Sequence, residues 1–237
     1  MKLQFSKQRN RALTRTEVVV MVAVIAVLIL IWVGKFFTSD LRGLRQQAWE
    51  IHCVNNVKQV ANSFRTWAGD HNDKFPMQTS VTNGGAMELA GGVDAWKTFQ
   101  VMSNLLGDPK TLICPADRNH AEAATNFSTD LQNKISYFVS LVVTNGNWQE
   151  TFLSGDDNFL INGSPVKPGL IEMVSNTPAA WNSDRHFFEN SQAWFFKNRR
   201  GYGNIALCDG SVQSFNNSNL TNQLHQTGLA TNRLAIP

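Results

Sequence analysis

An uninterrupted apolar run near the N-terminus constrains this chain more than any other feature. Residues 18–33 (VVVMVAVIAVLILIWV) contain no charged or polar side chain. A membrane-spanning helix needs about 20 mostly apolar residues. The run reaches that length when Leu13 and residues 34–37 are added, because Lys35 can extend its ammonium group to the membrane surface. The sequence therefore predicts one transmembrane helix over residues 13–37.

Positive charge precedes the run, at Lys2, Lys7, Arg9, Arg11 and Arg15. The positive-inside rule then places the N-terminus in the cytoplasm and the rest of the chain outside. A cleaved secretory signal would need small residues after the run, whereas residues 32–37 (WVGKFF) are mostly bulky. An uncleaved signal anchor remains open as an explanation.

The charge distribution argues against nucleic-acid binding. The formal net charge of the chain is +3, and the four basic residues within residues 1–12 account for more than all of it. The remainder is therefore nearly neutral, without the basic face that a nucleic-acid binder needs. Seven Trp and fifteen Phe predict a folded core.

Glu17 stands directly before the apolar run. A charged side chain costs on the order of 2.5–3.5 kcal/mol at the centre of a bilayer and less near its surface. A carboxylate in this place is therefore a candidate functional group that needs a partner.

Residues 12–20 (ALTRTEVVV) resemble the class III signal of type IV prepilins and pseudopilins. That family has a short basic leader, a small residue that is usually Gly, a hydrophobic first mature residue, and Glu at the fifth mature position. Here Ala12 takes the place of the Gly, Leu13 is the first mature residue, and Glu17 is the fifth. Arg15 and Thr16 depart from the family, which has apolar residues there.

The resemblance implies a function without catalysis. A prepilin peptidase would cut between Ala12 and Leu13 and methylate the new amine, and Glu17 would pair with the amine of a neighbouring subunit. The implied partners are that peptidase, other pilin-like subunits and the inner membrane, and not nucleic acid. The chain would cross the inner membrane once, with its C-terminal domain periplasmic or extracellular, and would later enter a type IV pilus or type II secretion-like filament.

The helical pattern continues beyond the membrane segment. Apolar residues recur at steps of three and four: Cys53, Val57, Val60, Ala61, Phe64, Trp67 and Ala68. Such a stripe is typical of a helix with one buried face. The helix is predicted from about Leu13 to about Gly69, and Pro76 prevents much continuation. Asp70, Asn72 and Asp73 are expected to cap the helix end and form the turn.

Strand signals follow the helix. Residues 135–143 (ISYFVSLVV) predict a strand, and residues 159–161, 170–174 and 193–196 are weaker candidates. Residues 204–208 and 211–215 predict a hairpin, with Asp209-Gly210 in a type I′ turn. The turn-rich residues 144–164 are expected to form a surface excursion.

The predicted fold class is therefore α+β. A long N-terminal helix, with its first half in the membrane, packs on a small antiparallel sheet as in pilins. The predicted division is a leader over 1–12, a membrane or filament-core helix over 13–37, its continuation over 38–76, and a β-rich domain over 77–237.

A second resemblance covers residues 53–76 (CVNNVKQ…DHNDKFP) and 112–117 (LICPAD). Both are similar to segments of prepilin-like proteins from planctomycete- and verrucomicrobia-type bacteria. Those proteins also carry a His…Asp-Gly element, here His186, Asp209 and Gly210, with a longer separation that implies an insertion. Because Cys53 and Cys114 lie in the two similar segments, the resemblance favours a disulfide between them over three buried thiols. Cys208 is expected to be a small core residue.

Other candidate sites each have a plainer explanation. Asp156 and Asp157 could bind calcium, but a solvated acidic turn is the favoured explanation. The aromatic residues Trp181, Trp194, Phe195 and Phe196 could form a binding patch, but core packing is favoured. No nucleophile elbow or paired-histidine zinc motif occurs, so no catalytic residue or metal ligand is predicted. The alternative function is a membrane-anchored binding or adhesion module with an unprocessed signal anchor.

Overall fold

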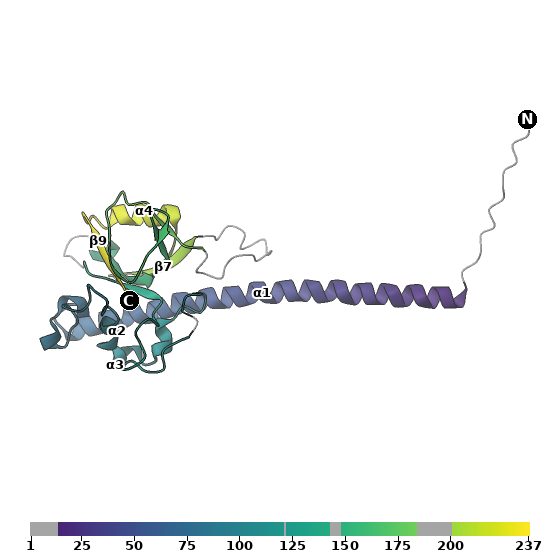
Figure 1. Cartoon of the computed structure of the whole chain (residues 1–237), viewed down its shortest axis with the longest axis horizontal. Coiled ribbons are helices and arrows are strands. Elements are labelled where there is room, and N and C mark those ends of the chain that lie inside the picture. Colours follow the sequence, from purple (N-terminus) through teal and green to yellow (C-terminus); the bar gives the residue numbers. More distant parts are fainter. Residues whose placement is uncertain (1–13, 121, 143–147, 184–200) are drawn as a thin grey trace, which may run out of the picture. The chain divides into compact units, whose positions relative to one another are not determined.

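The structure is a computed structural model that describes residues 14–120, 122–142, 148–183 and 201–237. The chain divides into two compact units, residues 1–42 and 43–237. Its described part has a mixed α+β fold, with an apolar N-terminal helix and an antiparallel sheet (Figure 1).

Helix α1 begins at Arg15 and ends at Asp70, close to the predicted limits. Within the first unit, Arg15–Lys35 is long and apolar enough to cross a membrane. At about 1.5 Å per residue it measures about 30 Å, which matches the hydrocarbon core of a bilayer. Every residue from 14 to 35 is exposed in the structure.

The part of α1 in the second unit buries the predicted apolar stripe. Its members include Val57, Ala61 and Phe64, which have no exposed surface. The helix stops where Asn72 and Asp73 adopt positive φ angles of 56° and 57°. The amide of Asp73 donates to the carbonyl of Ala68 at 2.9 Å. Asp and Asn tolerate this left-handed backbone better than most residues, which explains why the helix ends here.

Short helical turns follow α1. They are η1 (Pro76–Gln78), η2 (Val81–Asn83), α2 (Lys97–Gln100), α3 (Ser103–Leu106) and η3 (Pro109–Leu112). Phe99, Met102 and Leu112 from this segment are buried in one cluster with the stripe of α1. The turns therefore cover one side of the helix.

The main sheet has six antiparallel strands in the order β5-β9-β1-β2-β7-β8. They are β1 (Tyr137–Ser140), β2 (Phe152–Asp156), β5 (Gly169–Met173), β7 (Tyr202–Leu207), β8 (Val212–Asn216) and β9 (Asn232–Ile236). A second sheet, in the order β4-β3-β6, has β3 (Phe159–Ile161), β4 (Ser164–Pro165) and β6 (Ala179–Trp181). The turn η4 (Trp148–Glu150) precedes β2, and α4 (Asn217–Gln226) follows β8.

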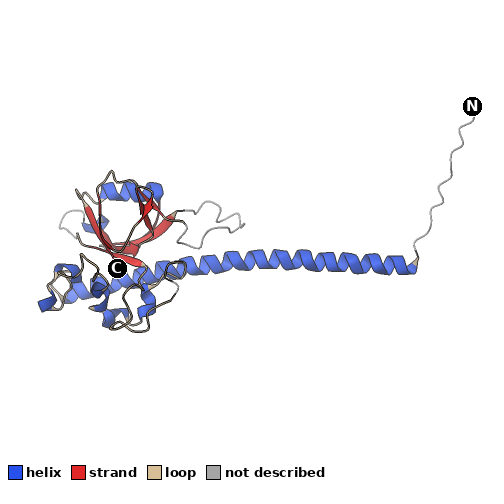
Figure 2. Cartoon of the chain, in the orientation of Figure 1, coloured by secondary structure: helices blue, strands red, loops and turns tan. Residues whose placement is uncertain are grey.

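The main sheet separates two apolar clusters. On one face, Tyr137, Val139 and Ala206 pack with the stripe of α1. On the other, Phe138 and Ile205 pack with Leu220 and Leu224 of α4 and with the small sheet. Figure 2 shows the sheet between α4 and the C-terminal part of α1. The alternation of side chains along each strand distributes them between the two clusters.

The expectation of a surface excursion over residues 144–164 is wrong for residues 151–159, which are buried, whereas residues 144–147 lie outside the described residues. This stretch contains β2, which is fully buried and pairs with both β1 and β7. Its sequence, FLSGD, lacks a strand pattern because it places the polar residues Ser154 and Asp156 inside the sheet. The hydroxyl of Ser154, for example, donates to the carbonyl of Phe138 at 2.7 Å. The strand predicted over 135–143 is shorter than expected.

The predicted hairpin is formed by β7 and β8, in which Ala206 pairs with Val212, but its turn is not type I′. A type I′ turn needs positive φ at both central residues, and Asp209 is not among the described residues with positive φ. The amide of Gly210 donates to the carbonyl of Leu207 at 2.9 Å, and Gly210 has φ +88°. The loop is therefore a three-residue connection with glycine in the left-handed position.

Candidate functional site

Glu17 lies in the first turn of α1 and is held by Thr14. The amide of Thr14 donates to Oε2 of Glu17 at 2.8 Å, and the Thr14 hydroxyl donates to the same oxygen at 2.9 Å. The amide of Glu17 in turn lies 3.4 Å from the Thr14 hydroxyl oxygen. This reciprocal arrangement is a capping box, which satisfies amide groups at a helix start. The predicted cleavage residues Ala12 and Leu13 lie outside the described residues.

The capping box was missed by the sequence analysis, although the Thr-x-x-Glu spacing of Thr14 and Glu17 is its signature. Both Thr14 donors bind Oε2. Glu17 is exposed, so its Oε1 is open to a further donor. The carboxylate can therefore keep its bonds to Thr14 and accept another partner.

Beyond Glu17, the apolar surface of α1 is fully open. The exposed fractions of its large side chains range from 37% at Val33 to 71% at Leu30. Apolar area of this extent is stable only in lipid or against another protein. This half of the helix needs a partner that the described chain does not supply.

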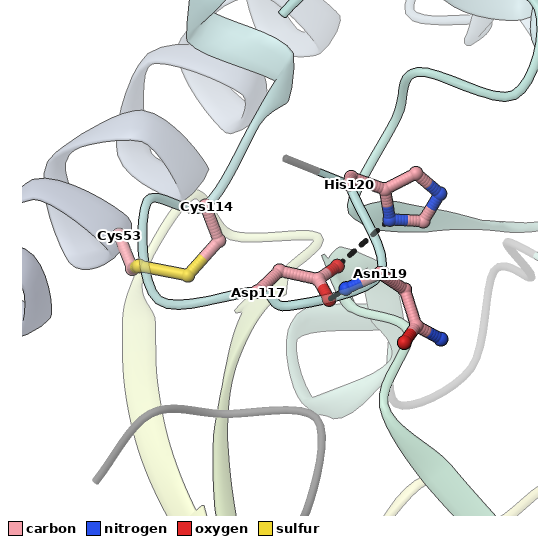
Figure 3. Close-up of polar contacts among 5 residues, drawn as sticks. All are labelled: Cys53, Cys114, Asp117, Asn119 and His120. Carbon is pink, nitrogen blue, oxygen red and sulfur yellow. Dashed lines mark hydrogen bonds and ion pairs between the residues drawn. A yellow bond between two sulfur atoms is a disulfide. The ribbon is translucent and has the colours of Figure 1, made fainter. Parts of the chain in front are cut away.

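A disulfide joins Cys53 of α1 to Cys114, 61 residues later, with a Cα–Cα distance of 4.8 Å. This is the pair that the second resemblance favoured (Figure 3). The side-chain amide of Asn56, one turn further along α1, donates to the carbonyl of Ile113 at 2.7 Å. The loop after η3 is therefore attached to α1 by a covalent bond and by a neighbouring hydrogen bond.

Cys208 is a free and buried thiol. Burial raises its pKa to about 12, which keeps it protonated and unreactive at neutral pH. It packs in the same cluster as Val57 and Ala206, as expected for a small core residue.

The Cys-Pro-Ala-Asp loop ends in a buried carboxylate, Asp117. Its Oδ1 accepts the amide of Asn119 at 3.0 Å, and Oδ2 lies 2.8 Å from Nδ1 of His120 (Figure 3). The carboxylate thus shapes the loop and orients the histidine ring.

The Asp209-Gly210 loop packs against α1. The guanidinium of Arg65 donates to the carbonyl oxygen of Asp209. A Cβ atom at Gly210 would lie 2.7 Å from Cδ of Arg65, and the φ of +88° favours glycine as well. The side chain of Asp209 accepts the amide of Ser211 at 2.8 Å. This part of the family-like element therefore has a structural role, and its predicted partner His186 lies outside the described residues.

Asp156 and Asp157 are buried, so the expectation of a solvated acidic turn is wrong. Oδ2 of Asp156 accepts the amide of Asn204 at 2.7 Å and its side-chain nitrogen at 3.0 Å. Burial raises the pKa of Asp156 to about 7, and the nearby charges of Asp117 and Asp157 act in the same direction. Within the described residues, no group of three or more His, Cys, Asp or Glu side chains could hold a metal. Calcium binding by Asp156 and Asp157 was the less favoured alternative in the sequence analysis, and it stays an alternative.

Trp181 belongs to the core. It is 2% exposed and stacks on Phe159 with ring centroids 4.7 Å apart. The explanation by core packing is therefore confirmed for this residue, and the other three predicted members of an aromatic patch lie outside the described residues.

Comparison of the chain with protein-family models, with curated proteins and with solved structures gave no match. The function must therefore be argued from the residues and geometry given above.

Proposed function

We propose that this protein is a pilin-like subunit of a type IV pilus or type II secretion-like filament. A prepilin peptidase cuts it between Ala12 and Leu13, and the exposed half of α1 then enters the filament core. The proposal rests above all on α1. One helix carries Glu17 at its head, an open apolar surface after it, and a buried stripe in a folded unit.

The disulfide supports the orientation across the membrane. Disulfides form and persist in oxidising compartments and are rare in the cytoplasm. Cys53 follows the apolar segment Arg15–Lys35, so the second unit would lie on the extracytoplasmic side. The positive charges before the segment lead to the same orientation by an independent argument.

Glu17 supplies the assembly contact in this proposal. Its present partner, Thr14, offers neutral donors. A charged amine adds a Coulombic attraction to its hydrogen bond with a carboxylate, which a neutral donor does not provide. The amine of a neighbouring subunit, placed against the open Oε1, would give the buried carboxylate a counter-charge in the apolar filament core. The capping box would orient the carboxylate for that contact.

The test is the intact mass and N-terminal sequence of the membrane-extracted chain, expressed with and without a prepilin peptidase. The expected product with the peptidase begins at methylated Leu13. A chain that still begins at Met1 or Lys2 in the presence of the peptidase contradicts the proposal.

Assembly is tested separately with Glu17→Gln, which keeps the size of the side chain and removes its charge. The expected result is normal cleavage with at least about a tenfold loss of sheared filament, the equivalent of one lost charge-assisted bond. The matched control is Glu172→Gln, because Glu172 is an exposed carboxylate paired with Arg233 and surface pairs contribute little. Equal filament yields from the two variants would exclude the assigned role of Glu17.

A membrane-anchored binding module is the second candidate, and the capping box favours it. A helix-start cap explains the carboxylate without any neighbouring subunit. This candidate expects an uncut chain, and no sheared filament from either the wild type or Glu17→Gln, so the same two experiments distinguish the two functions.

A further inference from the structure

Asp156 is a fully buried carboxyl group in the second unit. It lies at the end of β2, fully buried, and pairs in register with Tyr137 of β1. Its Oδ2 accepts two hydrogen bonds from Asn204 of β7, whereas its Oδ1 has no hydrogen-bond partner. An ionised carboxylate buried with one oxygen unsatisfied is strongly disfavoured.

Two other buried side-chain oxygen atoms also lack a hydrogen-bond partner, and both belong to residues close to Asp156 in the chain or in the strand register. They are the hydroxyl of Tyr137, which lies opposite Asp156, and Oδ1 of Asn158, two residues further along. Both can accept a hydrogen bond. A proton on Oδ1 of Asp156 would remove the charge and convert that oxygen from an acceptor without a donor into a hydroxyl donor.

The charged groups around Asp156 also favour its neutral form. The acidic groups that act on it are Asp117, in the loop after η3, and Asp157, the next residue. Tyr137 is a neutral neighbour, because burial and then the charge of Asp156 raise its pKa well above the usual value. The group on β7 is the neutral side chain of Asn204. Asp117 is itself paired with His120, whose Nδ1 lies 2.8 Å from Oδ2 of Asp117. Ionisation of Asp156 would thus bring one more negative charge beside Asp117 and Asp157.

We propose that Asp156 is a neutral carboxylic acid in the folded protein, and that its ionisation as the pH rises destabilises the region around β1, β2 and β7. The stability of the second unit would then depend on pH. This inference does not rest on the proposed filament function. Because an extracytoplasmic domain is exposed to the pH of its surroundings, the second unit would be most stable in an acidic medium.

The direction of the effect follows from proton linkage. The pKa of Asp156 is raised from 3.8 to about 7 on folding, so between these values the folded state binds more protons than the unfolded state. Stability therefore falls as the pH rises through this window. One proton changes the folding equilibrium constant by up to about tenfold per pH unit.

The experiment is urea denaturation of the full chain in detergent between pH 5 and pH 8, followed by tryptophan fluorescence. The wild type should lose stability as the pH rises. In Asp156→Asn, which cannot ionise, the change in the folding equilibrium constant between pH 5 and pH 8 should be at least about tenfold smaller than in the wild type. In Asp117→Asn, which removes one repelling charge, the pKa of Asp156 should fall towards its ordinary value, so the loss should end at lower pH and be smaller. An unchanged pH dependence in Asp156→Asn overturns the proposal.

Two further measurements do not depend on the variants. The wild type should show an infrared carboxylic acid C=O band that disappears as the pH is raised through about 7, and absence of this band at pH 5 overturns the proposal. Calcium added at pH 8 should leave the stability unchanged. If calcium restores stability and a chelator removes it again, a cation rather than a proton neutralises the site, and the proposal is wrong.

Discussion

The two halves of α1 are both apolar helix, but only the second arranges its apolar residues as a stripe that the same chain buries. In the first half, residues 18–33 are apolar on every face and all are exposed. In the second half, Val57, Ala61 and Phe64 are fully buried, whereas their chain neighbours Lys58 and Arg65 are exposed. A helix that is apolar all round needs an apolar environment on every side, and a helix with one stripe needs a single partner surface.

The two halves are therefore stabilised by different interactions. The second half belongs to a core with a disulfide, a covering segment and a sheet. The first half has no comparable contacts within the described chain, so its stability depends on lipid or on another protein. Substitutions in the two halves should therefore affect different measurements, and the following predictions test this separation from the largest effect to the smallest.

Truncation of one large side chain in each half should give the greatest contrast. Phe64→Ala removes a fully buried ring that lies 6.0 Å from the ring of Phe99 and 6.3 Å from that of Phe75, centroid to centroid. It should lower the free energy of unfolding by about 3–5 kcal/mol. Leu28→Ala, at a position that is 59% exposed, should change it by less than about 0.5 kcal/mol. Urea denaturation in detergent measures both.

The control for this contrast is membrane insertion. Leu28→Arg should weaken insertion by about 3 kcal/mol, whereas a substitution in the buried stripe should leave insertion unchanged. A Leu28→Ala variant that destabilises the second unit as much as Phe64→Ala would show that the two halves are not separate.

Removal of the disulfide should give the next largest effect. The variant with both Cys53→Ser and Cys114→Ser frees a loop of about 60 residues, and loss of such a native disulfide typically costs 2–5 kcal/mol. The free energy of unfolding of the second unit should fall by that amount, and the helical content of the first half should remain. Cys208→Ala is the control, because it removes a buried thiol without opening a loop. Equal losses would indicate packing rather than the crosslink.

The predictable parts of the fold are those with local periodicity. The stripe of α1 repeats at three- and four-residue steps, and the end of the helix carries Asn72 and Asp73, which suit left-handed turns. β9 was missed, because Asn232–Ile236 is a short segment whose partners β1 and β5 lie far away in the sequence. The helix α4 was missed as well, since its sequence NSNLTNQLHQ is mostly polar and its burial depends on Leu220 and Leu224.

The site residues divide in the same way. The Thr14–Glu17 cap has a sequence signature of four residues and could have been predicted. The burial of Asp156 could not, because acidic side chains are rarely buried and its donors come from Asn204, 48 residues later. The pairing of strands that are distant in the sequence creates the buried site around Asp156, and no local sequence pattern predicts it.

The smallest predicted effect concerns the start of the first half. Thr14→Val keeps the shape of the side chain and removes the hydroxyl that donates to Glu17 and accepts its amide. Loss of an N-cap costs about 1 kcal/mol, so the first turn of α1 should fray while the second unit keeps its stability. Amide hydrogen exchange at residues 15–18 in detergent measures the fraying. Thr16→Val is the matched comparison, because the Thr16 hydroxyl lies 3.1 Å from that of Thr14 whereas the bonds to Glu17 come from Thr14, so it should fray the helix less. If Thr14→Val frays the helix but Glu17 still supports filament assembly, the cap and the assembly contact are separate functions of one carboxylate. If assembly fails too, Thr14 positions Glu17 for its neighbour, and the first half depends on its own cap as well as on a partner.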